Sequence, residues 1–116
     1  MDIRHKNRIE VVENLFAYSF KQPSFIAPHK SDLFQVIVTK LEEIDNIIVK
    51  HAPKFPIDRI SKIDLAVLRL AVYELIINPT EPSKVVINEA VELAKELGGE
   101  KAYTFINGVL GKIITQ

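Results

Sequence analysis

This sequence contains no cysteine and no tryptophan, one methionine and only four glycines among 116 residues. Without cysteine the chain can form neither a disulfide nor a thiolate metal site, and it has no cysteine nucleophile. The absence suits a reducing compartment, so we expect a cytoplasmic protein. No signal peptide fits the start of the chain, because charged residues recur within the first ten positions.

The sequence also lacks a long apolar run and an excess of charge of either sign. Its longest apolar stretch, residues 63–77, is interrupted by Asp64, Arg69 and Glu74, and it is shorter than the roughly 20 residues needed to cross a bilayer. Fifteen lysines and arginines balance fifteen aspartates and glutamates, so a nucleic-acid-binding site would need positive charge gathered locally. The 47% hydrophobic and 26% charged residues are typical of one globular domain, which we place at residues 1–116.

Apolar residues recur at intervals of three and four, and no segment alternates convincingly with period two, so the sequence predicts an all-α bundle. A stripe from Phe34 to Ile48 runs unbroken through the second segment. The third is apolar nearly all round from Ala66 to Ile77, which is typical of a central helix. Five main helices are predicted at about Ile3–Phe20, Ser31–Lys50, Ser61–Ile77, Glu81–Gly98 and Glu100–Ile114, with a short helical turn near Ile57–Ile60.

Three positions carry more specific expectations about the helix ends and packing. Ser61 and Asp64 have the spacing of a capping box, in which each side chain binds a free backbone N–H. Gly98 suits a left-handed cap at the end of the fourth helix. Gly108 lies inside the last helix at a cost of roughly 1 kcal/mol relative to alanine, so we expect a neighbouring helix to approach it closely.

Catalytic chemistry finds little support in the sequence. The three histidines are scattered without a metal-ligand pattern, and the glycines follow predicted helices at the wrong spacing for a phosphate loop. Glu89, Glu92 and Glu96 share one helical face; paired carboxylates can act as acid and base, but a solvated face is the favoured interpretation. We therefore expect no enzymatic activity, no metal and no cofactor.

The start of the first helix is the best candidate for binding a polyanion. Arg4, His5, Lys6 and Arg8 lie within about two turns, where the positive end of the helix dipole adds to their field. On a helical wheel Arg4 and Arg8 flank the apolar face, so we expect both at the surface. An ordinary solvated helix start is the alternative, and clusters of this size are common.

Aromatic residues near such a site could stack on unpaired bases. Phe16 and Phe105 both lie on apolar stripes, however, so packing in the core is the favoured interpretation for each. Tyr103 lies at the edge of a stripe, from which it can reach a ligand.

Two blocks in the last third of the chain resemble the NusB family: KVVINEAVELAK at 84–95 and FINGVL at 105–110. A similar domain begins certain ribosomal-RNA cytosine methyltransferases, but this chain has no methyltransferase domain, so the free-standing factor is the better match. The resemblance implies a compact helical bundle of the NusB type, with a double three-helix arrangement. It also implies binding of boxA-like single-stranded RNA from ribosomal-RNA transcripts, together with the ribosomal protein that acts as NusE. The complex would join transcribing RNA polymerase and promote antitermination.

Carried over by position, the resemblance also implies site residues. Those for RNA are Arg4, His5, Lys6, Arg8, Phe16, Lys101, Tyr103, Thr104 and Phe105, and those for the partner protein are Asp64 and Arg69.

Three features depart from the family pattern. The stretch from Lys21 to Lys50 predicts one long helix where relatives have two, which gives a shortened N-terminal half. His5 stands at an arginine position, and Lys101 stands where an acidic or small polar residue is expected. These departures leave a second hypothesis open, a helical protein-interaction adaptor with little RNA affinity of its own.

Overall fold

The structure is a computed structural model that describes residues 2–99 and 101–115. Within these ranges every regular element is helical, which confirms the predicted all-α class, and none of these helices is long and apolar enough to cross a membrane. The elements are α1 (Ile3–Tyr18), α2 (Asp32–Thr39), α3 (Leu41–His51), the 3-10 turn η1 (Ile57–Arg59), α4 (Lys62–Val72), the π-helical turn η2 (Tyr73–Ile77), α5 (Ser83–Leu97) and α6 (Ala102–Ile114).

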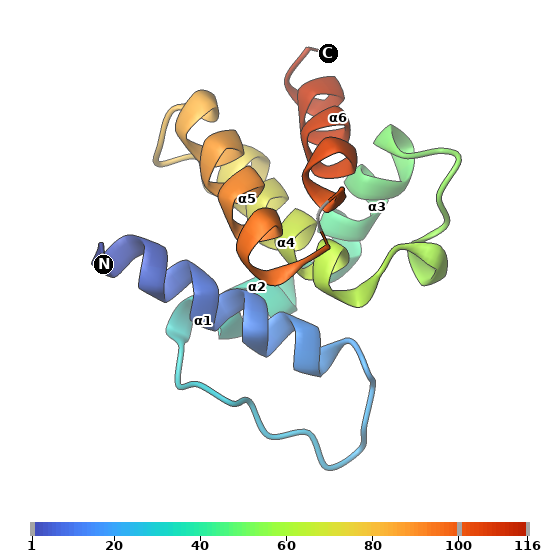
Figure 1. The fold of residues 1–116 in the computed structure, drawn as a ribbon. Coiled ribbons are helices and arrows are strands. Elements are labelled where there is room, and N and C mark those ends of the chain that lie inside the picture. Colours follow the sequence, from blue (N-terminus) through green and yellow to red (C-terminus); the bar gives the residue numbers. More distant parts are fainter. Residues whose placement is uncertain (1, 100, 116) are drawn as a thin grey trace.

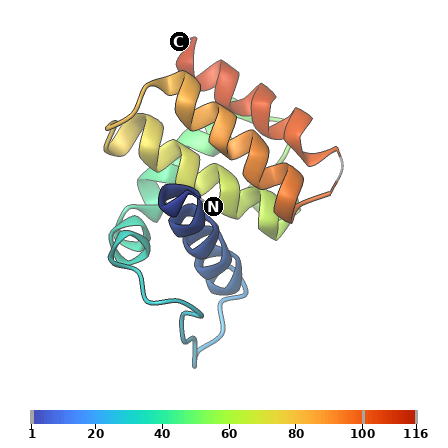
Figure 2. The same cartoon turned by 60° about the vertical axis from the view of Figure 1, so that its left-hand side comes forward.

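Helix α4 lies at the centre of the bundle, as its continuous apolar sequence predicted. Every residue from Leu65 to Tyr73 is buried, because α1, α3, α5 and α6 all pack against this helix (Figure 1). Figure 2 shows α4, α5 and α6 running alongside one another while α1 crosses them. This crossing brings the start of α1 to the side of α5, where the candidate site lies.

The prediction of one long helix between Ser31 and Lys50 is wrong. The chain breaks at Lys40, whose φ and ψ of −112° and 8° are not helical, and two helices, α2 and α3, meet there. The apolar stripe continues across the break, with Phe34 and Ile37 buried from α2 and Ile44 and Ile48 buried from α3. The structure therefore has six α-helices among its described residues, and this half of the chain keeps both helices expected of the family.

The cap predictions were met only in part. Ser61 caps α4, since its Oγ accepts the Asp64 N–H at 3.2 Å. The Oδ1 of Asp64, however, is buried without a hydrogen-bond partner among the described residues. At Gly98 the backbone is extended (φ −101°, ψ −166°) and not left-handed.

Space, and not backbone strain, therefore explains the glycine at 98. An added Cβ there would lie 2.8 Å from the Ala94 carbonyl oxygen. The expected close helix approach at Gly108 is wrong, because an added Cβ would meet no described atom within 4 Å. The predicted first residue of the last helix, Glu100, lies outside the described residues.

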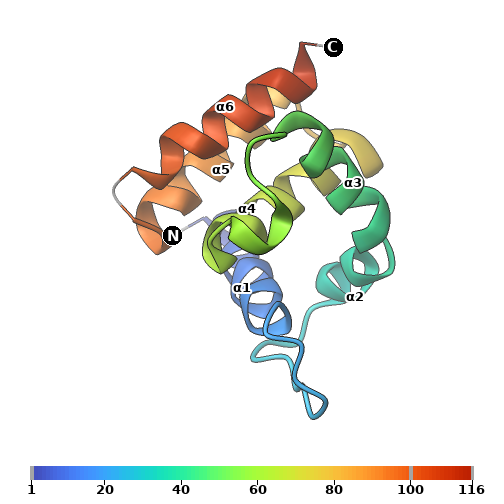
Figure 3. The ribbon, with the colours of Figure 1, turned by 90° about the vertical axis from the view of Figure 1, so that its right-hand side faces the viewer.

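A two-point clamp fixes the loop between α1 and α2. The Asn14 side chain, which is fully buried, donates from Nδ2 to the His29 carbonyl and accepts the His29 N–H at Oδ1, both at 2.9 Å. Phe25 anchors the middle of the loop by packing edge-on against Tyr18 at 5.2 Å between ring centroids. Figure 3 shows the loop extending away from the bundle between these attachments.

Candidate nucleic-acid interface

Arg8 is buried, contrary to the expectation that it lies at the surface. Its side chain is 9% exposed and binds Glu74 of η2 through three hydrogen bonds of 2.9 to 3.2 Å, two from Nε and one from an Nη. Such a two-point geometry is the strong form of an arginine–carboxylate pair. Burial lowers the pKa of Arg8, but the hydrogen bonds and charge of Glu74, together with the charges of Glu89 and Glu81, outweigh burial and raise this pKa above its ordinary value. In this conformation Arg8 holds α1 against the end of α4 and does not face solvent.

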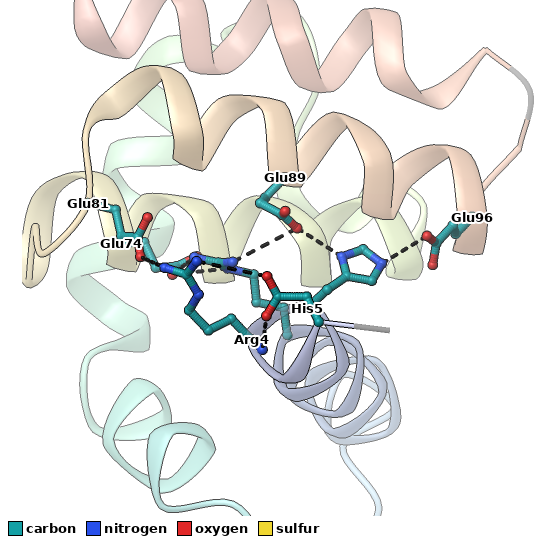
Figure 4. A network of polar contacts seen from close by, with 8 residues as sticks. Arg4, His5, Glu74, Glu81, Glu89 and Glu96 are labelled. Atoms are coloured by element: carbon teal, nitrogen blue, oxygen red, sulfur yellow. Dashed lines mark hydrogen bonds and ion pairs between the residues drawn. The ribbon is translucent and has the colours of Figure 1, made fainter.

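Two more basic residues of α1 are paired with carboxylates at or beside α5 (Figure 4). The Arg4 guanidinium lies 2.9 Å from Glu81 while remaining 66% exposed. His5 bridges Glu89 and Glu96, with its ring nitrogens at 2.9 and 2.8 Å from one carboxylate oxygen of each. The hydrogen bond with Glu89, followed by that with Glu96, raises the pKa of His5.

The predicted basic cluster is therefore charge-compensated. Three of its four basic groups, Arg4, His5 and Arg8, pair with five carboxylates, those of Asp2, Glu74, Glu81, Glu89 and Glu96, while the fourth, Lys6, is exposed. The local balance is four minus five, or −1, with His5 protonated, and −2 with His5 neutral. A polyanion would have to approach the exposed cations Arg4 and Lys6 while these carboxylates keep their present partners.

The aromatic ring of Phe16 is accessible, although core packing was the favoured interpretation. Phe16 is 37% exposed and packs edge-on against Phe20 at 5.1 Å between centroids. The Lys62 ammonium lies 5.3 Å from the centre of the Phe20 ring. Exposed rings beside a cation suit stacking and phosphate contact by single-stranded nucleic acid.

The start of α6 presents a second exposed group. Lys101, Tyr103 and Thr104 are all exposed, and the Lys95 ammonium from α5 lies 5.0 Å from the centre of the Tyr103 ring. Phe105 is half-buried against the core and packs on Phe55 at 5.0 Å between centroids. The structure thus places these four predicted residues together, with Phe105 shared between the core and the surface.

The two predicted partner-protein residues differ in their surroundings. Arg69 is buried and binds Asp45 of α3 at two points, 2.9 and 2.8 Å. Asp64 is partly buried near Gly98, and burial raises the pKa of its carboxyl group, against a smaller opposing effect of the Ser61 hydroxyl. Arg69 can therefore act on a partner only indirectly, by fixing α3 against α4.

The sequence did not indicate the acidic side of the site. The sequence predicts a solvated face for Glu89 and Glu96, and it assigns no binding role to Glu74 or Glu81. One signal was available: Glu89 and Glu96 lie seven residues apart, or two helical turns, which places both on the same side of α5. Their partner His5 is more than 80 residues away, and such a separation hides the pairing.

The model of the NusB family matches residues 3–115. This chain belongs to the NusB family. The transcription antitermination protein NusB of Acetivibrio thermocellus is 48% identical over 83 residues, which are 72% of this chain and 57% of that relative. NusB of Shewanella baltica is 36% identical over 110 residues, covering 95% of this chain and 81% of that protein.

Solved NusB structures share the fold along nearly the whole chain. T. maritima NusB superposes with a TM-score of 0.82 at 29% identity, over 99% of this chain and 92% of that one. NusB in the crystal structure of NusB and NusE with double-stranded RNA gives a TM-score of 0.73 at 28% identity, over 98% of both chains. These matches confirm the resemblance and the bundle type inferred from the sequence.

Proposed function

We propose that this chain is a transcription antitermination factor that binds boxA-like single-stranded RNA of ribosomal-RNA transcripts together with the ribosomal protein NusE. The proposal is supported by membership of the NusB family and by the similarity to a NusB that was crystallised with NusE and RNA. In this role residues 1–116 act as one binding domain without catalytic activity. The factor works in the cytoplasm, where it joins the transcribing RNA polymerase complex.

The observation that carries the RNA proposal is the exposed group at the start of α6. Lys101 supplies a charge, Tyr103 an exposed ring with Lys95 beside it, and Thr104 a hydroxyl. Arg4, Lys6 and the Phe16 ring supply the corresponding exposed groups from α1. Proteins that bind single-stranded RNA usually combine cations that contact phosphates with aromatic rings that stack on bases.

His5 and Arg8 serve the same site as positioning residues. Both are engaged by carboxylates of η2 and α5, so their role is to fix the orientation of α1 on which Arg4 and Lys6 are carried. On the partner side, Asp64 and Arg69 contribute to NusE binding. Arg69 does so indirectly, because its hydrogen bonds to Asp45 fix α3 against α4.

The test is a titration of a short boxA-like RNA, with and without NusE, at several salt concentrations. Binding should be weak alone and tighter with NusE. With three to four phosphate contacts, the slope of log affinity against log salt should be roughly −2 to −3. The double variant Lys6→Glu/Lys101→Glu should bind less tightly and with a shallower slope, whereas Lys40→Glu, at the exposed junction of α2 and α3, should match the unmodified protein. Binding that does not depend on salt, or no binding even with NusE, contradicts the proposal.

The adaptor hypothesis keeps one observation in its favour, the net negative balance of charge at the start of α1. An adaptor would bind NusE with the same affinity whether or not RNA is present. The two-component titration above separates these functions, because an RNA-binding factor requires the two affinities to be linked.

A further inference from the structure

A cavity of about 220 Å³ lies between α6 and the segment that follows α3. These two parts of the chain stand side by side in Figures 1 and 3. This volume is smaller than the ~300–1,000 Å³ of typical small-molecule pockets. The cavity therefore has room for one ring system.

A buried histidine without a full set of partners lines this cavity. The Nδ1 of His51 donates a hydrogen bond to the Ile47 carbonyl at 2.8 Å, so this nitrogen carries a proton. The Nε2 of His51 is buried and has no hydrogen-bond partner among the described residues. In the neutral ring Nε2 is an acceptor, but it is shielded from solvent, so a molecule in the cavity contacts the surroundings of His51 and not this nitrogen.

The rest of the lining combines rings and cations. Phe55, which is 48% exposed, and Phe105 meet edge-on in the cavity wall. Lys54 and Lys112 also line it, both are exposed, and neither forms an ion pair with any residue in 2–99 or 101–115. Rings for stacking and unneutralised cations are the two features by which proteins bind unpaired nucleotides without reading their sequence.

The glycine at 108 gains an explanation from the same cavity. Helix packing does not require it, because an added Cβ would meet no described atom within 4 Å. Gly108 instead lines the cavity, where the absence of a side chain keeps the volume open and lets a ligand approach the backbone of α6.

We propose that this cavity receives one unpaired base of the bound RNA, which stacks on Phe55 and Phe105 while Lys54 and Lys112 lie near the flanking phosphates. The inference rests on the proposed RNA-binding function and adds a base-binding subsite to it. Thr104 and Phe105 line the cavity and also belong to the exposed start of α6, so the subsite is continuous with the RNA surface proposed there. The base must leave its stack to enter, which favours single-stranded over duplex RNA.

The experiment uses two glycines of α6 as a matched pair. Gly108→Leu fills the cavity, whereas Gly111→Leu adds the same side chain to the same helix, also at a position where a Cβ meets no described atom within 4 Å. Each full-length variant is titrated with boxA-like RNA in the presence of NusE, using RNAs in which one base at a time is replaced by an abasic site. In the unmodified protein one abasic position should lower affinity at least tenfold. Gly108→Leu should lower affinity similarly for intact RNA and should no longer respond to that abasic position, and Gly111→Leu should leave both results unchanged.

The outcomes separate this inference from the function on which it rests. If the unmodified protein binds no RNA, the proposed function fails and the subsite fails with it. If it binds RNA, but Gly108→Leu and Gly111→Leu show the same affinity and the same abasic profile, only the subsite is overturned. A loss of NusE affinity in Gly108→Leu with an unchanged abasic profile would assign the cavity to the protein partner. Melting curves check folding, and Phe55→Leu, which removes a half-exposed ring, gives the same test if Gly108→Leu does not fold.

Discussion

Arg8 and Glu74, which are 66 residues apart in the sequence, join α1 to η2 through a guanidinium–carboxylate pair that is largely shielded from water. Their side chains are 9% and 15% exposed. Removing one member of such a pair leaves the other as an uncompensated buried charge, whereas replacing both with apolar residues of similar size is often close to neutral.

We therefore predict that Arg8→Met lowers the free energy of unfolding by about 3 kcal/mol. The double variant Arg8→Met/Glu74→Leu should recover most of that loss. Urea unfolding of Arg8→Met, Glu74→Leu and the double variant measures the coupling between these residues. Additive losses would show that the pair is not the source of the effect.

The stability contributed by His5 should depend on pH. Its pKa in the folded protein is raised above the ordinary value of about 6.5 by Glu89 and Glu96, while Arg8, on the same helix, lies 3.9 Å from Glu89. The contribution is therefore fully present below about pH 6.5 and is lost as the pH rises through the raised value. The difference in unfolding free energy between the unmodified protein and His5→Gln should be largest near pH 6 and should shrink toward pH 9.

Two controls accompany this prediction. The ring protons of His5, followed by NMR, should titrate at a lower pH in Glu89→Gln. Glu92→Gln should leave the titration unchanged, because Glu92 pairs with Lys95 and not with His5. A difference between the proteins that stays constant from pH 6 to pH 9 would contradict the assignment.

Two glycine-to-alanine substitutions should have opposite signs. Gly98→Ala should destabilise the protein by about 1–3 kcal/mol, because its Cβ would press on the Ala94 carbonyl and lie 3.3 Å from Asp64 Oδ1. Gly108→Ala should stabilise it by roughly 0.5–1 kcal/mol, since the space is open and alanine favours the helix. Thermal unfolding of both variants is the measurement, and equal effects would contradict the difference in space.

Ser61 and Asp64 should also behave differently from each other, although their spacing suggests one reciprocal motif. Ser61→Ala removes the cap of α4 and should cost about 1 kcal/mol. Burial raises the pKa of Asp64, so above that pKa the ionised carboxylate makes folding less favourable. This loss of stability disappears as the pH falls through the raised pKa and the carboxyl group becomes protonated in the folded protein. Asp64→Asn should therefore increase stability slightly at neutral pH and have no effect near pH 3. Urea unfolding of both variants at neutral pH and near pH 3 checks this. If Asp64→Asn lowered the free energy of unfolding at neutral pH, Asp64 would act as the second half of the capping box after all.

The sequence predicted the central position of α4 because burial on all sides requires a helix that is apolar on all sides. It did not predict the break at Lys40, because the apolar stripe keeps its spacing across that position and lysine carries no turn signal. The break at Lys40 lets α2 pack against α1 and α3 pack against α4. These contacts join residues far apart in the chain, so the local sequence does not reveal them.

The candidate site was predictable only as a set of residue types. The family resemblance predicted Arg8 and Phe16 as RNA-binding residues. Whether each side chain is exposed depends on neighbours that are distant in the sequence. Glu74 buries Arg8, while Phe16 stays accessible despite its position on an apolar stripe. Helical periodicity reports which residues share a face, but it does not report how far the neighbouring helices cover that face.

The clamp between Asn14 and His29 makes the geometry of the bundle independent of the length of the loop that it closes. Both attachment points, the buried Asn14 amide and the His29 backbone, lie ahead of Ser31, which caps α2. Residues inserted between Lys21 and Ser24 would therefore lengthen an exposed surface segment without shifting the start of α2, and lengthening such a loop costs little entropy. The loop is thus the position at which this fold can accept a tag, a fluorophore or a second domain while the proposed RNA and partner surfaces keep their arrangement.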